Sequence, residues 1–313
     1  MKLTIIVAAG LALAAALPAA PAAAQGSRTF VSGHGSDANN CTLATPCRTL
    51  VAAFAVTIAG GEIDVLDAAG YGTLTINKAI SIVNDGVGTS SILVPSGGTG
   101  ITINAGPSDA VNLRGLTIEG GGAGTYGIYF NTGGALTVTN SVIRHLVAEG
   151  IHFAPSATSK LLVSNTLVAD NTNSGIVVQP SGSGVVTAVL NRVAVSNNAA
   201  NGFSVFGQSS TGTVKATVLD SVATGNSTTG FYATSSAGHA PATLMLFSSA
   251  TANNTFGLFA DGPGATLRAF QTMATGNTTG WSAQNGGVVQ SYGNNAIDGN
   301  TGGETAPPSV GVK

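Results

Sequence analysis

The stretch Gly127-Ile128-Tyr129-Phe130 and its copies decide the fold of this chain of 313 residues. Each copy has a glycine, a large apolar residue, one variable residue and another residue that is usually apolar. The later copies begin at Gly150, Gly175, Gly202, Gly230, Gly257 and Gly280. Successive glycines lie 23, 25, 27, 28, 27 and 23 residues apart, and such a loose period is typical of stacked structural repeats. The sequence therefore predicts a solenoid.

Each repeat contains several short strands separated by turns. Apolar runs of three to five residues, such as residues 136–138 and 185–189, alternate with period two, which favours strands over helices. The same residue types recur at the same step of each repeat. Each strand is therefore expected to pair in parallel with its counterpart one coil away, about 4.8 Å along the axis. This predicts an all-β fold, a parallel β-helix.

Two sets of repeated positions are expected to line the inside and a corner of the coils. The first set should form one inward apolar column: Ile128, Ile151, Ile176, Phe203, Phe231, Leu258 and Trp281. The second set precedes short apolar runs and should form a polar ladder at a corner: Asn140, Asn165, Asn191 and Asp220. Stacked side-chain amides can hydrogen-bond to their copies in the neighbouring coils, which satisfies a buried turn.

The two ends of the chain differ in composition from the repeats. Met1-Lys2, an apolar run over residues 3–17 and small residues up to Ala24 indicate a signal peptide, residues 1–24, cleaved near Ala24. We therefore expect a secreted or periplasmic protein without a transmembrane anchor in the mature chain. A retained membrane anchor is the alternative, which the polar sequence after Ala24 disfavours. Residues 298–313 are polar and rich in Pro and Gly, so a flexible C-terminal tail is expected.

Residues 25–60 are expected to form an N-terminal segment ahead of coils that span residues 61–297. The only cysteines, Cys41 and Cys47, lie in this segment. Two thiols this close in an oxidising compartment indicate a local disulfide, because no His or further Cys lies near enough in the sequence to complete a zinc site. No metal site is predicted.

The same segment contains a helical pattern. Thr45 is the expected N-cap and Pro46 the first helical residue, and Leu50, Phe54 and Ile58 follow at intervals of four. The pattern ends at Gly60-Gly61. Such a helix would cap the open end of the solenoid, where strand edges are otherwise unpaired.

The N-terminal sequence also resembles a known superfamily. Residues 30–33, 35–39, 46–50 and 71–82 look like the opening of right-handed parallel β-helix proteins of the pectate-lyase-like superfamily, and with the repeats the resemblance covers about residues 28–297. It implies a right-handed parallel β-helix solenoid with an N-terminal capping helix. It is specific for the fold but not for an activity, because enzymes of many kinds and non-enzymes share this scaffold.

The resemblance allows two activities to be compared with the residues present. Calcium-dependent pectate lyases need clustered carboxylates and an Arg or Lys base, and this chain does not show that cluster. Among the motifs of polygalacturonase-like hydrolases only Gly33-His34-Gly35 has a match, and it lies ahead of the expected helix. No cofactor is predicted, and calcium would be needed only under the lyase alternative.

One candidate catalytic set follows from aligning the repeats. In this alignment Arg114 is placed level with the expected corner residues, Asn140, Asn165, Asn191 and Asp220. Glu119, His145 and Asp170 then lie in one column, one coil apart, with Arg144 beside them. Such a set could tune His145 as a general base or hold a cation. The alternative is a solvated turn in which these charges pair weakly, as surface charges usually do.

A candidate ligand-binding set comes from the variable residue of the glycine phrase. This position is expected to face outward and contains Tyr129, His152, Tyr232 and Phe259. Aromatic rings on one parallel sheet can stack on sugar rings, which predicts contact with a polysaccharide or cell-envelope glycan. The alternative is that loops such as residues 155–160 or 208–213 cover these side chains.

Composition excludes one class of function and leaves two. Charged residues make up 8% of the chain and the net charge is −2, so nucleic-acid binding is not expected. The first remaining hypothesis is a non-catalytic protein that binds polysaccharide or serves as an envelope or surface scaffold. The second is a polysaccharide lyase or glycoside hydrolase that acts on acidic glycans. The sequence leaves the oligomeric state open.

Overall fold

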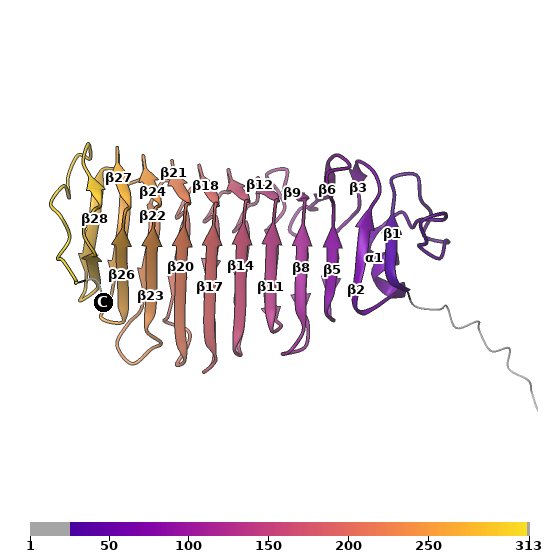
Figure 1. Ribbon diagram of the computed structural model, residues 1–313, viewed down its shortest axis with the longest axis horizontal. Coiled ribbons are helices and arrows are strands. Elements are labelled where there is room, and N and C mark those ends of the chain that lie inside the picture. Colours follow the sequence, from indigo (N-terminus) through magenta and orange to yellow (C-terminus); the bar gives the residue numbers. More distant parts are fainter. Residues whose placement is uncertain (1–25, 312–313) are drawn as a thin grey trace, which may run out of the picture.

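A computed structural model describes residues 26–311 as an elongated stack of coils (Figure 1). In each full coil the chain contributes one strand to each of three sheets, and all strand pairs are parallel. The prediction of an all-β parallel β-helix is therefore confirmed. The expected signal peptide, residues 1–24, lies outside the described residues.

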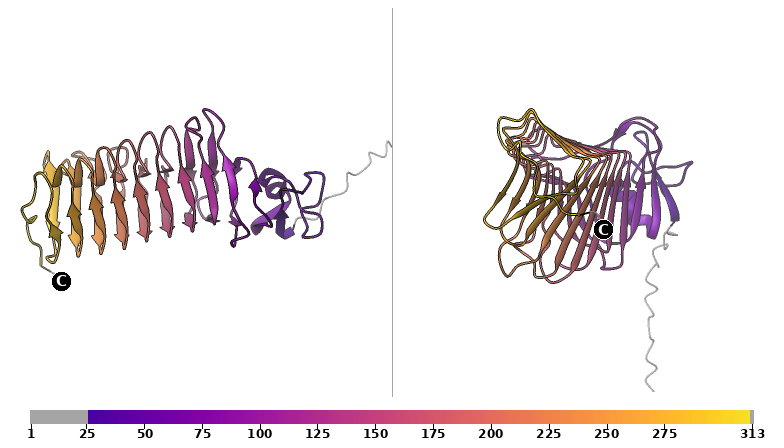
Figure 2. Two further views of the ribbon diagram at one scale, coloured as in Figure 1. Left: turned by 90° about the horizontal axis from the view of Figure 1, so that it is seen from above. Right: turned by 60° about the vertical axis from the view of Figure 1, so that its left-hand side comes forward.

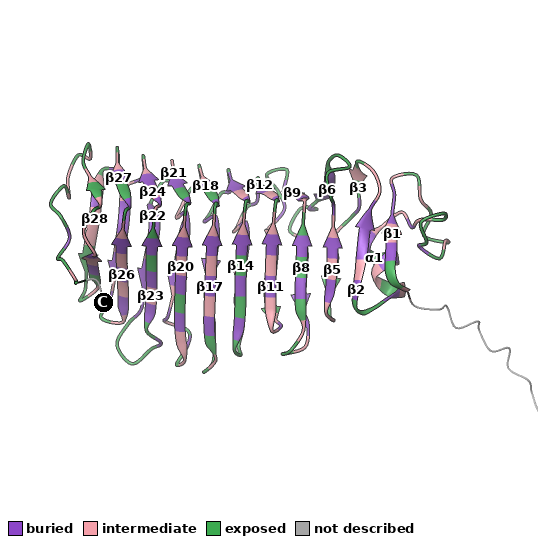
Figure 3. Ribbon diagram, in the orientation of Figure 1, coloured by how far each residue is buried: buried purple, intermediate pink, exposed green. Residues whose placement is uncertain are grey.

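Sheet A, whose strands face the viewer in Figure 1, has 11 strands. They are β1 (Gly26–Val31), β2 (Thr57–Val65), β5 (Ile80–Val83), β8 (Ala110–Arg114), β11 (Ala135–Thr139), β14 (Ser159–Ser164), β17 (Val185–Asn191), β20 (Thr213–Leu219), β23 (Ala242–Phe247), β26 (Ala265–Phe270) and β29 (Val288–Ser291). Buried and exposed residues alternate along these strands (Figure 3), because successive side chains point to opposite faces of a sheet.

Sheets B and C complete each coil, and Figure 2 shows the stack from two further directions. Sheet B contains β3 (Ala69–Gly70), β6 (Ser90–Leu93), β9 (Leu116–Glu119), β12 (Val142–Arg144), β15 (Leu167–Ala169), β18 (Ala194–Ser196), β21 (Val222–Thr224), β24 (Ala250–Ala252), β27 (Met273–Thr275) and β30 (Ala296–Ile297). Sheet C contains β4 (Leu74–Ile76), β7 (Thr99–Asn104), β10 (Tyr126–Thr132), β13 (Ile151–Phe153), β16 (Ile176–Val178), β19 (Phe203–Phe206), β22 (Thr229–Thr234), β25 (Phe256–Asp261) and β28 (Thr279–Gln284).

The recurring glycine of the repeat has a steric cause. A Cβ atom added to Gly175 would lie 2.2 Å from Val195 Cγ1 and 2.9 Å from the carbonyl oxygen of Gly202 in the next coil. The large residue that follows each glycine is inward, and these residues pair in register from coil to coil. The predicted apolar column is buried as far as Leu258, whereas Trp281 in the last sheet C strand is partly buried.

The predicted polar ladder lies at a different corner. The turn between sheets B and C buries a row of asparagines: Asn171, Asn198, Asn226, Asn254 and Asn277, which Asn300 extends. The Oδ1 atom of Asn226 accepts hydrogen bonds from both the backbone N–H and the Nδ2 of Asn198, at 3.2 and 2.9 Å. The same pair of bonds recurs at each following step. From Asn198 onward, each asparagine thus satisfies one backbone and one side-chain donor that the turn buries.

The expected ladder residues instead have other roles, so that prediction is wrong. Asn140, Asn165 and Asp220 are exposed and have a positive φ, and Asn191 ends β17 while Arg192 occupies the left-handed position. Asparagine tolerates this backbone conformation, and it directs the side chain outward here. The residue after each corner is the buried one, usually Ser or Thr.

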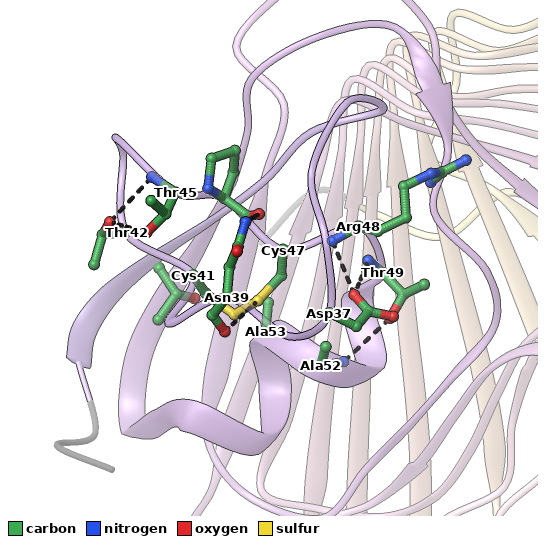
Figure 4. Close-up of a disulfide and its surroundings, with 12 residues drawn as sticks. Asp37, Asn39, Cys41, Thr42, Thr45, Cys47, Arg48, Thr49, Ala52 and Ala53 are labelled. Carbon is green, nitrogen blue, oxygen red and sulfur yellow. Dashed lines mark hydrogen bonds between the residues drawn. A yellow bond between two sulfur atoms is a disulfide. The ribbon is translucent and has the colours of Figure 1, made fainter.

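Cys41 and Cys47 form the predicted disulfide, and both side chains are buried (Figure 4). The chain around it is joined to β1, since the N–H of Cys47 donates to the carbonyl of Phe30 at 3.0 Å. The N–H of Ser32 donates in turn to the carbonyl of Cys47 at 2.9 Å. The disulfide loop therefore adds an extended segment to the edge of the first strand.

The capping helix exists but begins later than predicted. The chain at Pro46 is held in the extended segment beside β1, so Thr45 cannot be the N-cap and Pro46 is not helical. The helix is α1 (Leu50–Val56), and Thr49 is its N-cap. The carboxylate of Asp37 accepts the N–H of Thr49 at 2.9 Å (Figure 4), which fixes the start of the helix.

The helix also ends earlier than predicted. Thr57 is its C-cap and begins β2, where it pairs with Gly26 of β1. Ile58 and Gly60-Gly61 therefore belong to a strand. They lie between Thr57 and Glu62, which both pair with β1, and Gly61 pairs with Ile80 of β5, so pairing with neighbouring strands overrides the helical spacing. Within residues 26–311, no helix is long and apolar enough to cross a bilayer.

The segment after β30 differs from the flexible tail expected for residues 298–313. Gly302 pairs with Thr279 of β28, and Ser309 pairs with Ser291 of β29. The indole Nε1 of Trp281 donates to the carbonyl of Thr305 at 2.5 Å. The last coil offers unpaired backbone N–H and C=O groups, and this segment pairs with them despite its polar composition. Its described part, up to residue 311, therefore continues the stack.

The asparagine row makes a stability prediction. Asn226→Ala removes the acceptor for two buried donors of Asn198, which should lower the free energy of unfolding by about 3 kcal/mol. Asn131→Ala is the matched control, because Asn131 is exposed and bonds only to the exposed Asn104 side chain. It should change the free energy by less than about 0.5 kcal/mol. Urea denaturation compares the two, and equal effects would contradict the role of the ladder.

Candidate functional site

The corner between sheets B and C holds the predicted catalytic residues, but not in the predicted column. Glu119 pairs with Arg144 and not with His145. The cause is Gly115, which occupies the left-handed corner position that Asn140 occupies in the next coil. The alignment from Arg114 was therefore one residue out of register at this coil.

Three of these side chains nevertheless meet. The carboxylate of Glu119 lies 2.9 Å from Nε of Arg144 and 2.7 Å from Nδ1 of His145, and it accepts the N–H of Gly121 at 3.1 Å. His145 and Asp170 occupy the same corner position, with φ of 57° and 56°. In the part of the chain that the structure describes, Asp170 makes no ion pair with His145 or any other residue.

The electrostatics of this cluster are those of a surface ion pair. Partial burial alone raises the pKa of Glu119, but the bonds from Gly121, His145 and Arg144 outweigh it and hold that pKa below its ordinary value. The side chains of Arg144 and His145 are each 45% exposed. The carboxylate of Glu119 is therefore ionised and already accepts bonds from three neighbours, which leaves it poorly suited to accept a proton from a substrate.

The outer face of sheet C holds the predicted ligand-binding residues, and their register is as expected. Tyr129 pairs with His152 and Tyr232 pairs with Phe259. The column is continuous through residues Val177 and Ser204 between them. All four predicted side chains are partly exposed, so loops do not fully cover them.

The first aromatic cluster on this face is Tyr126, Tyr129 and His152. The Tyr129 and His152 rings are stacked, with centroids 5.0 Å apart and planes 3° apart, and Tyr126 meets Tyr129 edge-on at 5.0 Å. His152 Nδ1 lies 3.6 Å from the carboxylate of Glu149, which also accepts a bond from Asn173 at 3.1 Å. Burial and the nearby Glu149 charge raise the pKa of Tyr126, so its phenol stays protonated.

The second aromatic cluster, Phe206, Tyr232, Phe256 and Phe259, lies further along the same face. Tyr232 stacks on Phe259 at 5.2 Å and meets Phe206 edge-on at 5.8 Å, and Phe256 stacks on Phe259 at 4.8 Å. The hydroxyl of Tyr232 lies 3.4 Å from the carboxylate of Asp261. Burial raises the pKa of Tyr232, so this side chain also keeps its proton.

Between the clusters the outward column has two smaller residues, one apolar and one polar. Val177 and Ser204 are 3% and 0% exposed. Among the described residues, the buried side-chain polar atoms without a hydrogen-bond partner are Ser90 Oγ in sheet B and five on or beside sheet C: His152 Nδ1, Asn201 Oδ1, Ser204 Oγ, Gln208 Oε1 and Thr229 Oγ1. Unpaired buried polar groups are rare in folded proteins, so their concentration here marks this face as unusual.

Sequence reasoning missed Tyr126, Phe206 and Phe256. Tyr126 lies two residues before the inward Ile128, and strict alternation would place it inward as well. Instead Gly127 and Ile128 are both buried in succession, and the resulting break in alternation directs Tyr126 outward. The position two residues before the inward residue was therefore the signal for Tyr126 and Phe256. Phe206 lies on the same face as Ser204, two residues further along β19, so simple alternation could have revealed it.

The fold and the aligned outer face define the protein class as a parallel β-helix. Residues 75–256 match the family model for the right handed beta helix region, and the chain belongs to this family of right-handed β-helix proteins. No curated protein sequence matches the chain. Within residues 26–311, no group of three or more His, Cys, Asp or Glu side chains could hold a metal ion.

Several solved structures are similar in fold. Pectate lyase Pel9A has a TM-score of 0.53 and 18% identity, over 84% of this chain and 67% of that one. A rhamnogalacturonan lyase has a TM-score of 0.38 and 14% identity, over 75% and 76% of the two chains. The A-module of the Azotobacter vinelandii mannuronan C-5 epimerase AlgE4 has a TM-score of 0.41 and 15% identity, over 81% and 91%. At 18% identity the likeness to the pectate lyase concerns the fold alone.

The Glu119 cluster predicts a pH dependence of stability. Because its folded-state pKa lies below the ordinary value of 4.5, ionised Glu119 contributes stability that is complete above about pH 4.5 and is lost as the pH falls through the lowered pKa. Glu119→Gln should therefore narrow the difference between the melting temperatures at pH 7 and pH 3, measured by circular dichroism. The same difference in the variant and the wild type would contradict this assignment.

Proposed function

We propose that this protein is an exported β-helix protein that binds a polysaccharide along the outer face of sheet C and does not cleave it. The proposal rests on one observation. Two aromatic clusters lie in the same columns of sheet C, and buried polar atoms without hydrogen-bond partners lie between them. The predicted signal peptide and the disulfide support export to an oxidising compartment. A glycan of the medium or of the cell envelope is then within reach.

The spacing of the clusters suits an extended chain of sugars. His152 and Tyr232 are three strands apart in sheet C, which is about 14 Å at the usual strand spacing. Aromatic faces give sugar rings a large apolar contact at fixed positions. Successive rings of one glycan could thus contact both clusters at once, and the contacts would add as in a multivalent ligand.

The polar atoms between the clusters suit sugar hydroxyl groups. Asn201 Oδ1 accepts hydrogen bonds, and the hydroxyls of Ser204 and Thr229 both donate and accept. An unpaired buried polar group costs about 1–3 kcal/mol, so a glycan hydroxyl that bonded to one of these atoms would remove that cost. Polar groups of this kind fix the orientation of a ligand whose affinity comes from apolar contact.

Binding without turnover is supported by the state of the candidate catalytic residues. The carboxylate of Glu119 is held by Arg144, His145 and Gly121. Asp170 is exposed at the next coil without an ion pair to this set, within the described residues. A lyase or hydrolase that used these four residues would need them to converge on one bond of the substrate, and a paired carboxylate at a solvated corner does not provide that.

The aromatic clusters predict the effect of two substitutions on binding. Tyr129→Ala and Tyr232→Ala should each weaken the affinity for a bound glycan about tenfold, since a lost ring contact costs on the order of 1.4 kcal/mol. A glycan array of neutral and acidic polysaccharides identifies the ligand, and isothermal titration calorimetry measures the affinities. Phe247→Ala is the matched control, because Phe247 stacks on Phe270 at 5.3 Å on the outer face of sheet A and is 40% exposed.

Two outcomes would contradict the proposal. Equal losses in Phe247→Ala and Tyr232→Ala would show that binding does not involve sheet C. Release of shortened or unsaturated sugars that His145→Ala abolishes would show that the protein is an enzyme and that the corner cluster is catalytic.

A further inference from the structure

The outer face of sheet C ends in a hollow at its N-terminal end. A cavity of about 350 Å³ lies between α1 and the first two strands of the sheet, β4 and β7. Its lining includes Val51 and Phe54 from the helix and four threonines from the strands and the turn before them: Thr73, Thr75, Thr99 and Thr102. The volume is within the range usual for sites that bind small molecules.

The hollow is continuous with the proposed binding face. Thr75 pairs with Thr102, and Thr102 pairs with Tyr129 of the first aromatic cluster. Thr99 pairs in the same way with Tyr126. Thr75, Thr99 and Thr102 therefore occupy the same two outward columns as the aromatic rings, one or two coils earlier.

Helix α1 closes the face at this end. It directly precedes β2 along the chain, as β4 directly precedes β5, so it takes the place that a sheet C strand occupies in every later coil. A helix with its side chains is about 10 Å across, whereas strands are spaced about 4.8 Å apart. Its side chains therefore stand beside the outer face, and Val51 is 57% exposed there.

The helix wall is fixed in place. The ammonium group of Lys78 donates to the carbonyls of Phe54 and Thr57 at 2.8 and 2.5 Å, and it lies 4.3 Å from the centroid of the Phe54 ring. A cation at the C-terminal end of a helix is favourable, and the cation–π contact holds the ring. Phe54 is thus a positioned apolar surface beside four hydroxyl groups.

The chemistry of the lining indicates a neutral ligand. In the described part of the chain, the residues that line the hollow carry no ionisable side chain, and the nearby ammonium of Lys78 is bonded to two carbonyls. A carboxylated sugar would lose water there without gaining a charged partner, which is costly. A neutral sugar ring could place one face on the apolar wall and its hydroxyls on the threonines.

We propose that this hollow is a terminal subsite, which holds the end ring of a neutral glycan chain bound along sheet C. The inference rests on the proposed function, because it assumes that a glycan occupies the aromatic clusters. It adds that the chain is recognised by one of its ends, since α1 leaves no path for further rings beyond the hollow.

The test uses the purified protein and neutral linear hexasaccharides: cellohexaose, xylohexaose, mannohexaose and maltohexaose. Each is compared with a form blocked at its reducing end by 2-aminobenzamide and, for the three hexose series, with a form blocked at its non-reducing end by a 4,6-O-ethylidene group. For the series that binds, one of the two blocks should weaken the affinity at least tenfold. Thr102→Val removes a hydroxyl at nearly constant shape, and it should weaken binding of the open hexamer severalfold and reduce the discrimination against the blocked form. Thr137→Val in sheet A is the matched control and should change neither.

The outcomes separate the subsite from the binding face. If open and blocked hexamers bind equally while Tyr232→Ala still lowers the affinity, the terminal subsite is overturned and the binding face stands. If Thr102→Val behaves as Thr137→Val does, the subsite is also overturned. If only acidic oligosaccharides such as hexagalacturonate bind, the neutral ligand is wrong, and if no glycan binds, both proposals fail.

Discussion

The rest of this structure depends on the register between neighbouring coils. The buried row of asparagines at the turn between sheets B and C helps to fix that register. From Asn198 onward, each of these side chains accepts two hydrogen bonds from the asparagine one coil before. A shift of one residue would leave the turn with buried donors that have no acceptor, at a cost of several kcal/mol over the row. The glycine after the turn also contributes to this register. Because Gly175 has no side chain, Val195 of the next coil can pack closely against it.

The fold could be predicted from the sequence because the positions that repeat in each coil tolerate few residue types. Only glycine fits at the start of each inward phrase, and the apolar residue after it is buried in nearly every coil. The corner positions could not be told apart in the same way, because asparagine suits both the exposed left-handed corner at Asn165 and the buried ladder at Asn198. The start of the helix was missed because the pairing of Cys47 with Val31 lies outside any local pattern.

The candidate sites, like the fold, could be predicted from the sequence only in part. The column that contains Tyr129 and His152 follows directly from the repeat, so its residues could be named in advance. The Glu119 column was one residue out, because Gly115 and not Arg114 forms the corner of that coil. The contact of Glu119 with His145 and Arg144 nevertheless forms, because long side chains reach across a shift of one residue. Atoms such as Ser204 Oγ, unpaired and buried, depend on packing across coils, which no short stretch of sequence encodes.

Sheets A and C of this solenoid both carry stacked aromatic rings on their outer faces, and we assign ligand binding to sheet C. Sheet A offers Phe247 and Phe270, without buried unpaired side-chain polar atoms among its described residues, whereas sheet C adds the unpaired atoms around Ser204. The most direct measurement is a crystal structure of the protein with a bound oligosaccharide of the glycan that it recognises. We expect sugar rings along sheet C, in contact with Tyr129 and Tyr232. Sugar rings bound to sheet A, or to the corner of Glu119 and His145, would contradict this expectation.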